Sequence, residues 1–233
     1  MFSSSNRLKN FVKEKVCQAY DTIDYAALHP LSTLRKISHE STINFILHNC
    51  PKATICRTPQ KLIDIALSNV EVEGAFLEFG VFKGGSINYI ARKSPQQRID
   101  GFDSFEGLQE AWVNNEKYAF SLGGVLPKVK RNVDLHRGFF DKTLPLWLTD
   151  NQDRVAFLHI DCDLYSSTKI IFDCLRSRLQ TGSIIVFDDY FNFPHWEEYG
   201  HKVLQEFQKE TNLKYEYLGF ASKEIAIKIN SID

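Results

Sequence analysis

The chain has 233 residues, of which 43% are hydrophobic and 24% are charged, a composition typical of a globular domain with one sizeable core. The formal net charge of -1 gives no basic footprint for nucleic acid, and no apolar run in the sequence is long enough for a membrane span. The five cysteines lack zinc-ligand spacing and a paired framework, and the N-terminus lacks the apolar core of a secretory signal. These features predict a cytoplasmic protein with reduced thiols.

Residues 1–73 are predicted to form a helical N-terminal extension that packs on the remaining chain and serves as a lid. Helical patterns cover 7–23, 41–50 and 59–70, and prolines interrupt them. A helical arm of this kind is compatible with a homo-oligomer.

Residues 74–233 are predicted to form one α/β domain, because β-like runs alternate there with helical ones. The β-like runs are 74–80, 97–105, 134–140, 154–163, 182–189, 214–220 and 224–230. Such alternation indicates a mostly parallel sheet covered by helices on both faces. Three residues separate the last two runs, too few for a parallel crossover, so we expect a seven-stranded sheet whose last strand is antiparallel, at an edge.

The segment 106–131 interrupts this alternation with a long stretch that has no regular pattern. Long loops inside compact domains are more often functional than not, so we expect it to act as a lid.

A glycine-rich turn, "LEFGVFKGGS", follows the first strand of this domain and opens a helix. Gly80, Gly84 and Gly85 allow the backbone to approach a ligand, and the helix start offers free N–H groups to an anion. The spacing is not G-x-G-x-x-G, and Glu78 before the first glycine would repel a dinucleotide pyrophosphate. An amine-bearing ligand with its own carboxylate, such as S-adenosylmethionine, fits better; a tight structural turn is the alternative.

Asp103 stands about 20 residues beyond the glycine turn, at the end of the next strand. A carboxylate there can accept hydrogen bonds from both hydroxyls of a ribose, although it can also serve as a helix cap or turn residue. Together with the glycine turn, Asp103 favours a nucleoside cofactor.

Acidic residues gather at the ends of two later strands, which should be neighbours in the sheet: Asp161, Asp163, Asp188 and Asp189. Converging carboxylates raise one another's pKa unless a cation compensates their charge. Oxygen ligands favour Mg²⁺, Ca²⁺ or Mn²⁺ over zinc, so the pattern predicts a divalent cation. For Asp163 the alternative of a helix cap stays open.

Five motifs occur in the order and spacing of the macrocin O-methyltransferase family, whose members use S-adenosylmethionine and Mg²⁺ to methylate sugar hydroxyls of macrolides and aminocoumarins. They are "FLEFGVFKGGS", "DSFEGL", "GFFDKTLP", "HIDCDLYSST" and "IIVFDDY". The chain resembles this family over roughly residues 55–210. The resemblance implies a Rossmann-like methyltransferase fold, the cofactors S-adenosyl-L-methionine and Mg²⁺, and a small-molecule sugar or glycoside as substrate.

The resemblance also implies roles for individual residues. The implied cofactor-binding residues are Glu78, Gly80, Gly84, Gly85 and Ser86 at the methionine part, Asp103 at the ribose, and Ser104, Phe105, Phe140 and Asp141 at the adenine. The implied metal ligands are Asp161, Asp188 and Asp189. The sequence departs from the family pattern mildly at Phe82 and Lys83, where Trp and Arg are expected. The helical segment before Gly74 also departs from the family, and because it should shape the acceptor pocket, the resemblance does not fix the acceptor.

Methyl transfer to a hydroxyl also benefits from a general base. Asp161, His159 and His195 are the candidates, with His136 as a further histidine near the strand ends. A metal-independent methyltransferase for a phenol or carboxylate, and a non-catalytic module with the same fold, are the alternative functions.

Overall fold

The computed structural model describes residues 29–113 and 115–233, together with residues 12, 13, 15, 16, 18 and 19. Most of the helix predicted over residues 7–23 therefore lies outside the described residues.

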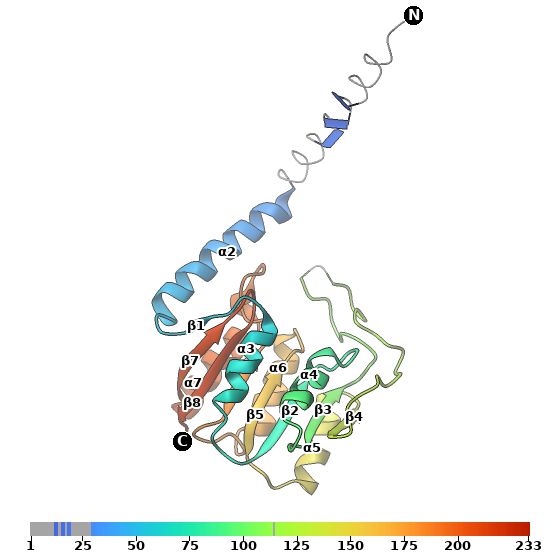
Figure 1. Ribbon diagram of the computed structural model, residues 1–233, viewed down its shortest axis with the longest axis vertical. Coiled ribbons are helices and arrows are strands. Elements are labelled where there is room, and N and C mark those ends of the chain that lie inside the picture. The colour runs from blue at the N-terminus through green and yellow to red at the C-terminus, as the bar shows by residue number, and fades with distance from the viewer. Residues whose placement is uncertain (1–11, 14, 17, 20–28, 114) are drawn as a thin grey trace, which may run out of the picture.

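The described chain is built on one eight-stranded sheet with the order β1-β7-β8-β6-β5-β2-β3-β4 (Figure 1). The strands are β1 (Thr54–Ile55), β2 (Ala75–Phe79), β3 (Ile99–Asp103), β4 (Val133–Arg137), β5 (Val155–Ile160), β6 (Ile184–Phe187), β7 (Lys214–Phe220) and β8 (Ile225–Ser231). All neighbouring pairs are parallel except the two that β8 makes. This confirms the predicted mostly parallel α/β sheet whose last strand is antiparallel.

Two details of the sheet differ from the prediction. The last strand, β8, lies between β6 and β7 and pairs with both, so it is not an edge strand. The eighth strand is β1, which has two residues and pairs with the end of β7 at Gly219 and Phe220. Two residues are too short a run to produce a detectable alternation, which is why the sequence did not reveal this strand.

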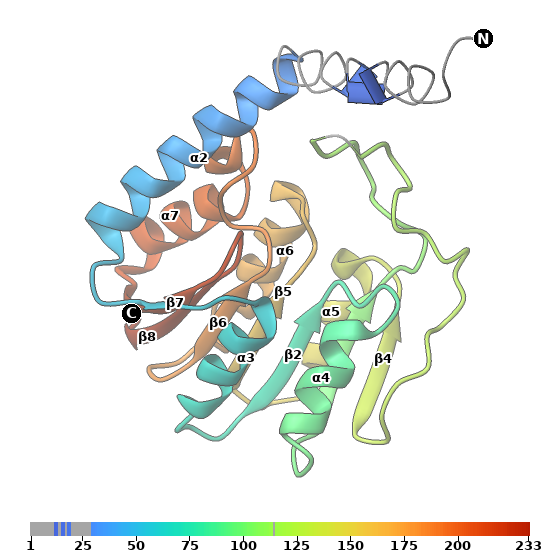
Figure 2. The same ribbon diagram turned by 45° about the horizontal axis from the view of Figure 1, so that its top comes forward.

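Helices cover both faces of the sheet (Figure 2). They are α2 (Pro30–Asn49), α3 (Pro59–Ser68), α4 (Gly85–Lys93), α5 (Phe140–Asp150), α6 (Tyr165–Leu175) and α7 (Gly200–Thr211), with a short 3₁₀ helix η1 (Trp196–Glu198). Strand β6 shows how two cores arise: Ile184 packs in the layer of α3 and α4, and Ile185 packs in the layer of α5, α6 and α7. None of the described helices has both the length and the apolar character needed to cross a bilayer.

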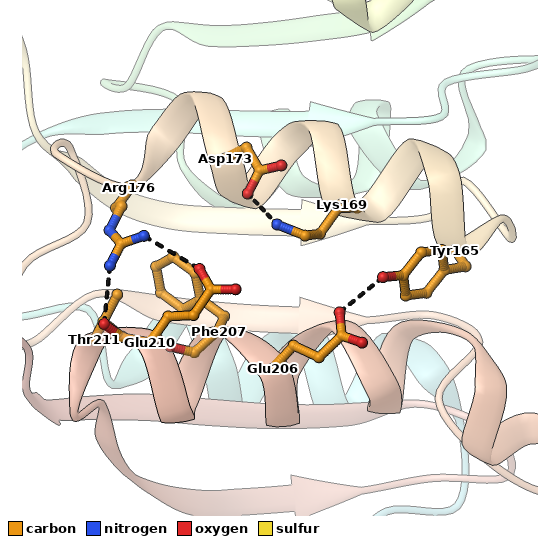
Figure 3. Close-up of polar contacts among 8 residues, drawn as sticks. All are labelled: Tyr165, Lys169, Asp173, Arg176, Glu206, Phe207, Glu210 and Thr211. Carbon is orange, nitrogen blue, oxygen red and sulfur yellow. Dashed lines mark hydrogen bonds and ion pairs between the residues drawn. The ribbon is translucent and has the colours of Figure 1, made fainter.

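Polar contacts join α6 to α7 along their exposed sides (Figure 3). The Tyr165 hydroxyl donates a hydrogen bond of 2.7 Å to the Glu206 carboxylate. At the other end of α6, the Arg176 guanidinium donates to the side chain and the backbone oxygen of Glu210. Because Tyr165 is the first residue of α6, the contact with Glu206 fixes the chain just after the acidic end of β5.

Helix α2 packs on the segment that follows β6. The Trp196 indole donates to the Ser41 hydroxyl at 2.8 Å, and the Asn192 backbone N–H donates to the Thr42 hydroxyl at 2.9 Å. The Phe45 ring lies 5.4 Å from that of Trp196, measured between centroids. The division into an extension over 1–73 and a domain over 74–233 stays a prediction.

Candidate active site

A cavity of about 450 Å³ opens at the carboxyl ends of the central strands. This size is within the range of small-molecule sites. Its walls come from the turns after β2, β3, β5 and β6, from the segment that precedes β4, from the start of α5, and from the β7–β8 turn. Seven of the predicted site residues line it: Gly80, Asp103, Ser104, Phe140, Asp161, Asp188 and Asp189.

Gly80 brings the ends of β2 and β5 together. Its φ is +91°, and a Cβ atom on it would lie 1.7 Å from the carbonyl oxygen of Asp161. No other residue fits there, because such a contact is far inside the van der Waals distance. The glycine therefore places the turn after β2 directly beside the first acidic residue after β5.

Asp103 holds the glycine turn in shape. Its Oδ2 accepts hydrogen bonds of 2.8 Å from the backbone N–H groups of both Val81 and Phe82, and its Oδ1 accepts one of 2.7 Å from Phe105. A carboxylate has roughly four acceptor positions, so the side chain keeps about one for a ligand hydroxyl in the cavity. The ribose contact of Asp103 stays a prediction.

Glu78 lies away from the cavity, fully buried beneath the glycine turn. Its carboxylate contacts His159 Nδ1 at 3.0 Å and accepts a hydrogen bond of 3.0 Å from the Ser86 hydroxyl. Burial lowers the pKa of the His159 imidazole, but the hydrogen bond and the charge of Glu78 outweigh burial, so that this pKa is raised. The buried side chains of Glu78 and His159 and the partly buried Ser86 thus form a polar cluster that supports the turn.

Neither candidate histidine lines the cavity. His159 is 1% exposed and engaged with Glu78, and His195 is an exposed residue that precedes η1. His136 pairs instead with Asp100, at 2.7 Å. We therefore assign no catalytic role to any of these three histidines.

The other predicted cofactor residues that do not line the cavity are Gly84, Gly85, Phe105 and Asp141. Gly84 and Gly85 begin α4, and Phe105 is buried with a positive φ of 58°. The Asp141 side chain is 45% exposed and pairs with Lys142. Their contacts with a cofactor stay predictions.

The acidic residues converge as the sequence predicted. Carboxylate oxygens of Asp161, Asp163 and Asp189 lie within 4.8 Å of one another, and Asp188 lines the same cavity. Burial, followed by the charge of Asp188, raises the pKa of Asp161 well above its ordinary value. Burial and then the charge of Asp189 raise the pKa of Asp163 to about 8.

Asp163 belongs to this cluster and is not a helix cap. Helix α6 begins at Tyr165, its N-cap residue is Leu164, and no side chain caps it. The backbone of Asp163 has a φ of +61°, which turns the chain out of the strand before the helix starts. The donor set close enough to share one ion is thus three carboxylates, those of Asp161, Asp163 and Asp189, while Asp188 lines the cavity outside this group; oxygen ligands fit a hard divalent cation such as Mg²⁺.

Two of the cavity residues that were not predicted bear on the chemistry of the site. Lys223, in the β7–β8 turn, donates a hydrogen bond from Nζ to Asp189, and Trp112 lies in the segment that precedes β4. A signal for Lys223 was present in the sequence, since a turn that follows β7 lies at the same sheet edge as the end of β6. For Trp112 no local pattern was available, because its segment has no regular structure.

Comparison with known proteins finds a family model that matches the part of the chain that carries the candidate site. The family model described as "Methyltransferase domain" matches residues 77–190, which run from the glycine turn to the acidic pair after β6. This segment of the chain thus resembles a methyltransferase domain. The family model thus confirms the resemblance to methyltransferases that the five motifs indicated.

A curated relative of this chain is 8-demethyl-8-(2,3-dimethoxy-alpha-L-rhamnosyl)-tetracenomycin-C 4'-O-methyltransferase of Streptomyces olivaceus. It is 31% identical over 141 residues, which cover 51% of this chain and 54% of the relative. The chain therefore spans about half the length of this relative.

Two solved structures have the same fold as this chain. The calicheamicin methyltransferase CalS11 matches with a TM-score of 0.59 and 22% identity, over 72% of this chain and 77% of the other. The O-methyltransferase NovP matches with a TM-score of 0.55 and 20% identity, over 73% and 77%. At these identities the likeness establishes the fold alone.

Proposed function

We propose that this protein is a methyltransferase that transfers the methyl group of S-adenosylmethionine to a hydroxyl of a sugar or glycosylated metabolite, with the help of a divalent cation. One observation carries the proposal: the acidic cluster after β5 and β6 and the glycine turn after β2 line one cavity. A methyl donor and a cation-held hydroxyl would thus lie side by side.

The cofactor belongs at the β2–β3 end of the cavity. Gly80 leaves room there for a close approach, and Asp103 and Ser104 offer polar atoms to the ribose. The Phe140 ring lines the same end and offers an apolar surface to the adenine. The remaining predicted cofactor contacts would need this end of the cavity to rearrange on binding.

The cation belongs at the β5–β6 end, where Asp161, Asp163 and Asp189 would hold it with Asp188 beside them. A bound Mg²⁺ polarises a substrate oxygen and lowers the pKa of its hydroxyl. The carboxylates themselves fix where that oxygen lies relative to the methyl donor, and such orientation contributes a large part of the rate of a displacement reaction.

Asp161 is our candidate for the proton acceptor. It lies at the junction of both ends, because Gly80 packs against its backbone. Its carboxylate would thus lie next to both the bound hydroxyl and the methyl donor, where it can accept the proton of the hydroxyl. The surrounding apolar side chains, such as Leu164 and Phe140, exclude water from the reacting atoms.

The acceptor class is supported by the relative that acts on a rhamnosyl tetracenomycin, as its name states. A sugar presents two neighbouring oxygens, and this arrangement suits a cation held by few carboxylates. Rhamnosides and other deoxysugar glycosides are therefore the first acceptors to test.

The test combines cofactor binding with methyl transfer. We expect calorimetry to detect S-adenosylmethionine binding, and mass spectrometry to detect a methylated glycoside in the presence of Mg²⁺. Addition of EDTA and the variant Asp189→Asn should each abolish transfer. The matched control is Asp173→Asn, whose side chain is 52% exposed and pairs with Lys169 on the outer side of α6 (Figure 3).

Two other outcomes identify the alternative functions. Methyl transfer to a phenol or carboxylate that survives EDTA would indicate a metal-independent enzyme. A protein that binds no S-adenosylmethionine at all would indicate a non-catalytic module.

A further inference from the structure

A second cavity, of about 410 Å³, lies between α2, α7 and β7, at the β7 end of the sheet (Figure 2). This size is also within the range of small-molecule sites. Strands β8 and β6 separate β7 from β5, so this cavity is distinct from the candidate active site. Its lining residues, none of which lines the candidate active site, are Phe45, Asn49, His201, Gln205, Gln208, Tyr215 and Tyr217.

No acidic side chain, lysine or arginine is among the described residues that line the second cavity. Six of the seven lining residues carry a polar group, and the seventh is Phe45. The His201 imidazole is neutral at pH 7, because burial lowers its pKa to about 4. An ion that entered this cavity would lose hydration without gaining an ion pair from the lining residues. The lining therefore favours a neutral ligand.

Two amide groups in the lining are held in place by their nitrogen atoms. The Gln205 amide nitrogen donates to the Tyr215 hydroxyl, and the Gln208 amide nitrogen donates to the Leu213 backbone oxygen, each at 3.2 Å. Within the described chain, the two amide oxygens have no hydrogen-bond partner, and neither is sealed from solvent. Each oxygen is thus accessible and oriented before a ligand arrives, which lowers the entropic cost of binding.

Aromatic rings form the rest of the lining. The rings of Tyr215 and Tyr217 pack edge to face with 5.3 Å between their centroids, and their hydroxyls lie 3.2 Å apart. The Phe45 ring packs edge-on against Tyr217 at 5.9 Å and against His201 at 5.3 Å. The cavity thus combines packed aromatic rings with amide oxygens that accept hydrogen bonds. A sugar ring matches this combination, because its C–H groups are apolar and its hydroxyls donate hydrogen bonds.

We propose that the second cavity binds a neutral, polyhydroxylated ring such as a sugar, whose hydroxyl groups donate hydrogen bonds to the amide oxygens of Gln205 and Gln208. This site goes beyond the proposed function and does not rest on it, because the two cavities share no lining residue among those described.

The experiment titrates the methyl α-glycosides of glucose, mannose and rhamnose, one at a time, into the isotope-labelled full chain. Nuclear magnetic resonance follows the side-chain amide signals of Gln205 and Gln208, which report on this cavity directly. We expect at least one glycoside to shift both signals in a saturable manner. Gln205→Met and Gln208→Met, each followed through the signal of the other glutamine, should weaken binding by about 3- to 10-fold, the effect of one lost hydrogen bond.

Gln109→Met is the matched control, because Gln109 lines the candidate active site and not the second cavity. It should leave the glycoside affinity measured at Gln205 and Gln208 unchanged. A second comparison tests the preference for a neutral ligand. The methyl glucuronide differs from the glucoside by a carboxylate, and it should bind more weakly than the glucoside because the lining offers it no ion pair.

The outcomes are independent of methyl transfer. No saturable shift with any of the three glycosides, or unchanged affinity in both Gln205→Met and Gln208→Met, overturns the sugar site. Equal affinity for the glucoside and the glucuronide overturns the preference for a neutral ligand. Binding that weakens in both variants and not in Gln109→Met supports the inference, whether or not the protein transfers a methyl group.

Discussion

Glu78 on β2 and His159 on β5 face each other at the same position of neighbouring parallel strands, with 3.0 Å between the carboxylate and Nδ1. Both side chains are at most 1% exposed. The pKa of His159 is raised, which favours an imidazolium beside the Glu78 side chain, and both groups are buried. This pair joins the strand that carries the glycine turn to the strand that leads to the acidic cluster.

Glu78→Gln should destabilise the fold by about 3 kcal/mol, because it leaves the buried imidazolium without its counter-charge. Urea denaturation at neutral pH measures the effect. Glu198→Gln is the control, since Glu198 pairs with Lys202 on the surface and should change stability little. A Glu78→Gln protein as stable as the control would contradict a charged pair.

Gly80→Ala should prevent the ends of β2 and β5 from meeting, because the added methyl group would overlap the carbonyl oxygen of Asp161. We expect a loss of about 3 kcal/mol or more, from the clash and from the left-handed backbone. Gly85→Ala is the control: its added Cβ meets no atom within 4 Å, and alanine suits the start of α4. Thermal unfolding compares them, and equal midpoints would refute the predicted clash.

The strand ends could be predicted because the glycine turn and the acidic residues each follow an apolar run. In such a run the hydrophobic residues either alternate with polar ones or are continuous, and both patterns are typical of strands. Once the strands were expected to be parallel, their carboxyl ends had to share one sheet edge, and Asp161 was expected close to Asp188 on that basis. The convergence of these carboxylates in one cavity agrees with this reasoning.

The burial of Glu78 could not be predicted in the same way. Its partner His159 is 81 residues away in the sequence, and the contact follows from strand order and register together. The position of β8 in the sheet could not be predicted for the same reason. The short connection between β7 and β8 shows that these strands are antiparallel, but it does not show which strand pairs with the other edge of β8. Local patterns fix direction and face, whereas pairing across the sheet depends on the whole fold.

His201 should make the protein less stable as the pH falls. Burial lowers the pKa of its imidazole to about 4, and its Nδ1 lies 2.9 Å from the Tyr190 hydroxyl. The imidazole has a pKa near 6.5 in the unfolded chain, so its contribution to stability is complete above about pH 6.5 and is lost as the pH falls towards 4. We expect a loss of about 1–2 kcal/mol between pH 7.5 and pH 5.

Urea denaturation at the two pH values measures this loss in the wild type and in His201→Gln. The variant keeps a side chain that can hydrogen-bond Tyr190 but does not titrate, so its stability should fall less over this range. An identical fall in both proteins would show that other groups are responsible.

Lys223 should compete electrostatically with a divalent cation, because its ammonium group already bonds Asp189, a side chain that is 7% exposed. Lys223→Met removes this positive charge from the acidic cluster. We expect Mn²⁺ to bind the variant at least about tenfold more tightly, since charges this close interact by several kcal/mol even at an effective dielectric constant near 20. Calorimetry or the paramagnetic signal of Mn²⁺ measures the affinity without any methyl transfer.

Lys228→Met is the matched control for this prediction, because Lys228 lies on β8 and pairs with Glu71 away from the cavity. Its Mn²⁺ affinity should equal that of the wild type. If Lys223→Met instead weakened Mn²⁺ binding, the lysine would be needed to hold Asp189 in position, and its charge would not be the dominant effect. Asp161→Asn, which removes a carboxylate central to the cluster, should weaken Mn²⁺ binding in either case.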